Sequence, residues 1–330
     1  MNFPYTIRLV LLSLSCFFIV QTILAFALNF AAPRLIRLAR HMKASSASQL
    51  LFASRLMPVA LAMFLVACLC VPSYLWFEPR GSVEDVGLLC VALAILGAAI
   101  CIWPIVRAAR ASANSLHFAG ACKSKSETFS MPGESSPLWL ISQEAPLIAV
   151  AGIFSQRVLI SAPVLRALSP EELQATLRHE RAHRLWHDNF RRLLLLLAPL
   201  SFPFFRGLRE LDRAWAKFTE WAADDFAAAG DQREAILLAS AIVRVARLGT
   251  PSSRPLFLSS LADGAELSER VERLLNAKPS PESNELDESK FLPRKAMYAV
   301  AFLAVAATLA SLYFLPATLL AAHELLERLI

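Results

Sequence analysis

Long stretches without a charged residue are the strongest constraint on how this chain can fold. The first extends from Leu9 to Pro33, the second from Leu56 to Phe77, the third from Val86 to Val106 and the fourth from Ala296 to about Leu320. Each is long enough for an apolar helix of about 20 residues, the length that crosses a lipid bilayer. The sequence therefore predicts a membrane protein with four spanning helices.

The composition supports a membrane protein. Of the 330 residues, 56% are hydrophobic and only 18% are charged, which is too apolar for an ordinary soluble domain. The net charge is +6, and the basic residues lie mainly beside the apolar runs. We attribute this excess to membrane topology and expect the lipid bilayer, not nucleic acid, as a partner. The six cysteines show neither a zinc-binding nor a disulfide pattern.

The charges between the runs predict an orientation in the cell membrane. The connector 34–55 has five basic residues and no acidic one, whereas the loop 78–85 is net acidic. The positive-inside rule then places the connector and residues 107–295 in the cytoplasm and both termini outside. Arg8 argues weakly against an external N-terminus. A signal peptide cleaved near residues 25–27 is the alternative to an uncleaved first span.

The pattern of a helix start precedes the sequence motif that could bind a metal ion. Ser169 is a good N-cap, Pro170 suits the first helical position, and Glu172 completes a capping box. The helix that follows contains His179-Glu180-Arg181-Ala182-His183, which reads H-E-x-x-H.

On a helix, His179 and His183 project from one face and can bind one Zn²⁺ ion. Glu180 is displaced by one residue and can act as general base toward water. The alternative is a chance match, with two histidines on a solvated basic face. His187 shares the same face, but we expect it to lie at the edge of the site.

A second helical segment, 208–229, offers the third ligand that a catalytic zinc needs. Glu220 and Asp224 are four residues apart and share a face. We expect Glu220 to bind the metal and Asp224 to accept the free ring N–H of a ligand histidine. The alternative is a pair of exposed acids, which the flanking Trp221 and Ala223 make less favourable.

Two further segments position this site. Residues 147–154 and 157–161 read as a strand pair around Gly152, either an edge on which an extended peptide docks or a cover for the helices. Residues 193–205 are apolar but too short to span a membrane. We expect them to be buried or to lie on the membrane surface.

These motifs resemble the BlaR/MecR-type membrane zinc metallopeptidases (metallopeptidase family fifty-six). The resemblance rests on Leu168–His183, on Asp188 five residues after the second histidine, on Glu220-x-x-Ala223-Asp224, and on Arg270-Val271-x-Arg273-Leu274-Leu275. It covers nearly the whole chain. It implies one Zn²⁺ per chain held by His179, His183 and Glu220, with Glu180 as catalytic base and Asp224 supporting a ligand histidine.

The resemblance also implies a fold class and a domain order. We expect a mainly α membrane protein with four transmembrane helices and a cytosolic α+β, gluzincin-like zinc peptidase domain between the third and fourth. The expected order is three spans in 1–110 (about 9–32, 56–77 and 86–106), a linker at 111–136, the zinc metallopeptidase domain at 137–277, a linker at 278–295, and the fourth span with a short tail at 296–330.

The function implied is regulated cleavage of a cytosolic protein, such as a transcriptional repressor. The chain ends soon after the fourth run, so we do not expect the penicillin-sensing domain that the β-lactam receptors of this family carry. An HtpX-type quality-control protease is the nearest alternative. A non-proteolytic transducer that keeps the zinc domain as a scaffold is a second. An intramembrane protease fits poorly, because arginines surround the H-E-x-x-H motif.

Overall fold

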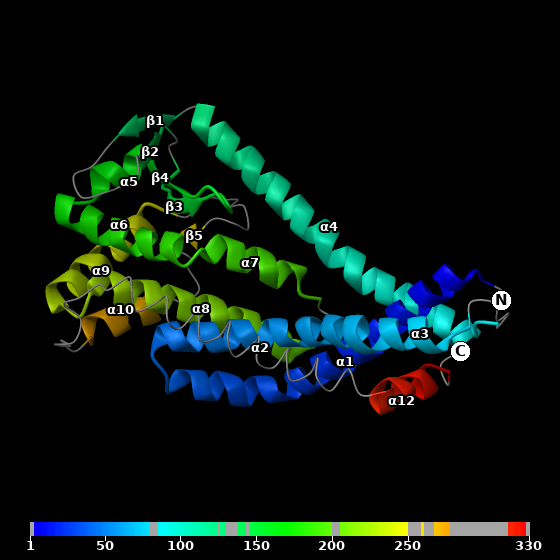
Figure 1. Cartoon of the computed structure of the whole chain (residues 1–330). Coiled ribbons are helices and arrows are strands. Elements are labelled where there is room, and N and C mark those ends of the chain that lie inside the picture. The colour runs from blue at the N-terminus through cyan, green and yellow to red at the C-terminus, as the bar shows by residue number, and fades with distance from the viewer. Residues whose placement is uncertain are drawn as a thin grey trace.

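The computed structural model describes residues 3–79, 85–124, 126–129, 138–142, 145–199, 205–249, 259–260, 267–277 and 316–327. Most of these residues are helical, and a small mixed sheet accompanies the helices (Figure 1). The predicted linker 278–295 and residues 296–315 of the predicted fourth span lie outside the described residues. Helix α12 (Pro316–Glu327) follows them.

Three helices are long and apolar enough to cross a membrane, which indicates membrane association. They are α1 (Tyr5–Arg40), the continuous helix formed by α2 (Ala44–Leu65), the π-helical turn η1 (Val66–Cys70) and α3 (Val71–Phe77), and α4 (Leu88–Ser124). Large apolar side chains along them stay exposed, including Phe30, Met63 and Ile95 at 60–63%. Such surfaces suit a lipid environment.

The long helices continue beyond the uncharged runs. Most of the connector 34–55 is helical, because α1 continues to Arg40 and α2 begins at Ala44. The linker predicted at 111–136 is helical as far as Ser124 in α4. Charged and small residues can end a membrane span without ending the helix that carries it.

The remaining elements form a domain at the end of the molecule opposite the two termini (Figure 1). Its helices are α5 (Ala162–Ala167), α6 (Pro170–Leu185), α7 (Asp188–Leu197), α8 (Arg206–Ala228), α9 (Gln232–Arg247) and α10 (Leu267–Leu275). Its strands are β1 (Ser126–Phe129), β2 (Leu138–Ile141), β3 (Ile148–Ala151), β4 (Arg157–Ser161) and β5 (Ser259–Ser260).

The sheet has the order β1-β2-β4-β3-β5, with β2 and β4 parallel and the other neighbours antiparallel. The predicted strand pair is β3 and β4. Gly152 allows the connection, because its φ of +94° and the close approach of the Ser155 carbonyl oxygen exclude a side chain. Ala149 and Val150 also pair with β5, so this part of β3 is not a free edge.

The two largest apolar cores among the described residues hold the domain together. In the first, the sheet packs on α6, α9 and α10 through residues such as Ile148, Leu177 and Leu238. In the second, α8 lies along the ends of α1 and α2, and its residues Leu211 and Trp215 are buried there. The helices that carry the membrane-spanning segments therefore continue directly into the domain core.

Candidate metal centre

The histidine helix begins as the sequence predicts. Ser169 Oγ accepts a hydrogen bond from the Glu172 backbone N–H, and the Glu172 carboxylate accepts one from the Ser169 N–H, at 2.9 Å. This capping box fixes the start of α6 and hence the face on which His179 and His183 lie. The two imidazoles are buried, with exposed fractions of 0% and 1%.

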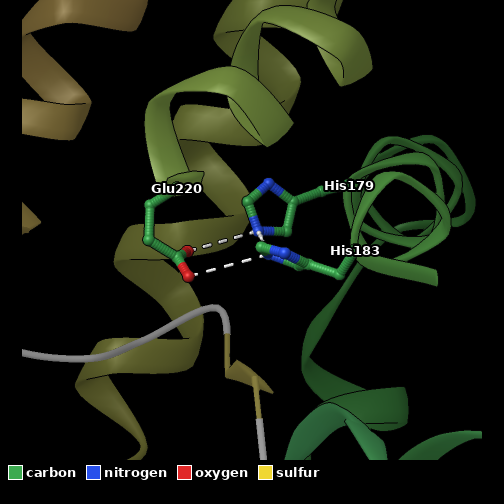
Figure 2. Close-up of side chains that lie close together, drawn as sticks. All are labelled: His179, His183 and Glu220. Atoms are coloured by element: carbon green, nitrogen blue, oxygen red, sulfur yellow. Dashed lines mark hydrogen bonds and ion pairs between the residues drawn. The ribbon is translucent and has the colours of Figure 1, made fainter. Parts of the chain in front are cut away.

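The three predicted ligands come together where α8 faces α6. His179 Nε2 lies 3.1 Å from His183 Nε2, and Glu220 points its carboxylate at both rings (Figure 2). The distances are 3.5 Å from His179 Nε2 to Glu220 Oε2 and 3.7 Å from His183 Nε2 to Glu220 Oε1. These atoms form a compact group that could hold a metal ion.

The spacing of the donor atoms is compatible with a zinc ion. Zn–N and Zn–O bonds of about 2.0–2.2 Å in tetrahedral geometry separate neighbouring ligand atoms by roughly 3.3–3.6 Å. The three observed separations lie within a few tenths of an ångström of that range. Two imidazole nitrogens and one carboxylate oxygen are also ligand types that zinc accepts.

Both histidines are oriented by an aspartate on the opposite side of the ring. Asp224 Oδ1 lies 3.0 Å from His179 Nδ1, and Asp188 Oδ2 lies 2.7 Å from His183 Nδ1. When the proton of each imidazole lies on Nδ1, beside the aspartate, each Nε2 presents a lone pair toward the other. Two lone pairs 3.1 Å apart repel unless a cation lies near both.

The charges around the cluster also favour a cation. Burial would lower the pKa of His179, but the adjoining Asp224 and Glu220 carboxylates outweigh it and raise this pKa to about 9. Burial would raise the pKa of Glu220, but His183 and Arg270 hold it below its ordinary range. The residues present therefore fit a divalent metal ion.

Arg270, on α10, is, like Asp188, a member of the site whose contact with the cluster sequence reasoning missed. It is 2% exposed and donates two hydrogen bonds to Asp224, of 2.9 Å from Nε and 2.6 Å from Nη2. Its Nη1 lies 3.1 Å from Glu220 Oε2. One guanidinium thus holds both carboxylates that α8 contributes to the site, Glu220 and Asp224. The sequence placed Arg270 in the family pattern, but gave no sign of this contact.

Asp188 and Asn189 fix the helix that follows the motif. The chain leaves α6 at Leu185, and His187 adopts the left-handed conformation, with φ 53°. This turn removes His187 from the ligand face and returns Asp188 to His183. The Asn189 side chain donates to the carbonyl oxygens of Val150 and Gly152, at 3.1 and 2.9 Å, and so ties α7 to the sheet.

Glu180 is placed for acid–base chemistry. It is fully buried beside His179, and burial raises the pKa of its carboxyl group. Neither carboxylate oxygen has a hydrogen-bond partner among the described residues. Buried carboxylates normally have hydrogen-bond partners. A buried carboxylate without one, beside a candidate metal site, is suited to accept a proton from a reacting water molecule.

The site reaches the surface on the side of Glu220. The Glu220 side chain is 14% exposed, and Arg192, whose Nη2 lies 3.7 Å from Glu220 Oε1, is 18% exposed. The side chains of both histidines and Asp224 are at most 1% exposed. Among the described residues, the cluster is therefore least buried at Glu220 and Arg192.

Comparisons with family models and with curated proteins gave no match for this chain.

Proposed function

We propose that this chain is a membrane-anchored zinc metalloendopeptidase of the BlaR/MecR type, which cleaves a cytosolic regulatory protein such as a transcriptional repressor. The observation that carries the proposal is the convergence of two aspartate-oriented imidazoles and Glu220 beside the unpartnered carboxylate of Glu180. A purely structural zinc site has no need of such a base.

The protein residues divide the chemistry among them. His179, His183 and Glu220 would hold the metal, and Asp224 and Asp188 keep the imidazoles in the required orientation. A zinc ion bound there supplies a Lewis acid that polarises the scissile carbonyl and acidifies water. Glu180 accepts the proton of the attacking water and delivers it to the leaving amine.

The membrane setting supports an anchored enzyme that acts at the cytosolic face. The basic residues Arg34, Arg37, Arg40 and Lys43 surround the short turn between α1 and α2, at the end of the molecule that holds the metal site. The positive-inside rule puts that end in the cytoplasm.

Replacing Glu180 with Gln tests the peptidase assignment. The variant keeps the size of the side chain but removes the base, so zinc should stay bound while cleavage of a peptide library falls by about 10²-fold or more. Glu171→Gln, on the exposed first turn of the same helix, is the matched control and should retain activity. Undiminished cleavage by Glu180→Gln would refute the assignment, and zinc binding without cleavage by the wild type would favour the scaffold alternative.

A further inference from the structure

A buried arginine of α2 connects this helix to α8 and to the end of α7. Arg55 is 2% exposed, although α2 is an apolar helix. Its Nε donates to Asp212 Oδ1 of α8 at 3.0 Å, and its Nη2 donates to the Ala198 carbonyl oxygen just beyond α7 at 3.2 Å. Burying a charged side chain in an apolar helix costs free energy, so a buried arginine with specific partners indicates a functional role for that arginine.

The contact with Ala198 holds the membrane-proximal end of α7. A second arginine, Arg107 of α4, donates to the neighbouring Leu196 carbonyl oxygen at 2.9 Å. Cations at a helix C-terminus bind its unpaired carbonyls and oppose its dipole. Since α7 begins at Asp188, this ten-residue helix spans about 15 Å between the arginines and the aspartate that orients His183.

The contact with Asp212 holds α8, which carries Glu220 two turns further along. The same helix pair is joined again beside the ligand, where Ser48 Oγ of α2 lies 2.8 Å from Thr219 Oγ1, and both side chains are buried. Thr219 immediately precedes Glu220. Arg55 is thus bonded to both elements that approach the metal site from the membrane side.

We propose that Arg55 is a positioning residue of the metal centre. By bonding α7 and α8 at one end, it fixes the separation between the Asp188–His183 pair and Glu220 at the other. A movement of α2 would then change the geometry of the ligands. The proposal rests on the metal site of the proposed function, but not on peptide hydrolysis.

The test measures metal binding and ligand geometry in the full-length protein in detergent. Zinc affinity and the visible spectrum of the Co²⁺-substituted protein are compared for the wild type, Arg55→Gln, Arg55→Lys and Asp212→Asn. Arg37→Gln, an exposed arginine on α1, is the control. We expect Arg55→Gln to weaken zinc binding by about tenfold, the lower end of the effect of removing an outer-sphere partner, and to alter the Co²⁺ spectrum. Arg55→Lys should be intermediate, because an ammonium cannot reproduce both contacts.

A merely structural ion pair would lower the melting temperature but leave zinc affinity and the Co²⁺ spectrum unchanged, and that result would overturn the proposal. If Arg55→Gln does not fold, the isosteric Asp212→Asn decides, with the same two outcomes. Cleavage is not part of the readout. An absence of peptidase activity in the wild type would therefore contradict the proposed function and leave this test intact.

Discussion

His183 Nδ1 lies 2.7 Å from Asp188 Oδ2, although the chain changes direction between the two residues. The left-handed His187 makes this contact possible, because it ends α6 and starts α7 so that the aspartate returns to the imidazole. We expect Asp188→Asn to weaken zinc binding by about 10–100-fold, since the amide cannot accept the ring proton with the same strength. Isothermal titration with zinc measures this.

Asp225→Asn is the control for that variant. Asp225 is half exposed and pairs with Arg273, outside the ligand cluster. The Asp225→Asn variant should bind zinc with the same affinity as the wild type. Equal affinities for Asp188→Asn and the wild type would show that the contact does not support the metal.

Arg270 compensates two buried carboxylates, so its loss should destabilise the metal-free protein. We expect Arg270→Met to cost about 3–5 kcal/mol, because Asp224 and Glu220 stay buried without their cation. Zinc supplies positive charge beside Glu220, so saturating zinc should raise the melting temperature of the variant by more than that of the wild type. Thermal unfolding with and without zinc checks both expectations.

Arg273→Met, on the same helix, gives the comparison. Arg273 pairs with Asp225 in a half-exposed ion pair, so its loss should cost less than about 1 kcal/mol. Similar losses for the two arginine variants would contradict the role assigned to Arg270.

The packing of α8 on α1 is also testable. A Cβ at Gly207 would lie 2.3 Å from the Asn29 carbonyl oxygen, so Gly207→Ala must push the helices apart. We expect a loss of about 1–3 kcal/mol. A Cβ at Gly120 in α4 would meet nothing within 4 Å, and Gly120→Ala should be neutral or stabilise the helix by roughly 0.5–1 kcal/mol. Thermal denaturation of both variants separates these outcomes.

Cysteine labelling with a membrane-impermeant maleimide tests the proposed orientation of the protein in the membrane. Met42 lies in the turn between α1 and α2, and Asp85 lies just before α4. We expect Met42→Cys to react only in inverted vesicles and Asp85→Cys only in intact cells. Reaction of both from the same side would contradict the topology.

The ligand cluster was predictable because it depends mainly on local patterns. A capped helix places His179 and His183 on one face, and a second helix with Glu220 and Asp224 supplies the opposing carboxylates. The contact of Arg270 with Asp224 was not predictable, because it joins residues 46 positions apart through the packing of two helices. The proximity of the ligands is observed, and their binding of a metal stays a prediction.

The extent of the long helices was predicted less well. Uncharged runs mark the part of a helix that suits lipid, whereas a helix ends only where its backbone conformation changes. Helix α4 therefore continues past Arg107 to Ser124, and the connector 34–55 is mostly helix. Arg55 lies in this connector. Its partners Asp212 and Ala198 could not be identified without the arrangement of the helices.

The most direct test of the account is the zinc content of the purified full-length protein compared with that of Glu220→Ala. We expect about one zinc ion per wild-type chain and loss of the metal, together with peptide cleavage, in the variant. Zinc that stays bound after Glu220 is removed would show that this carboxylate is not a ligand and that the centre has been misidentified.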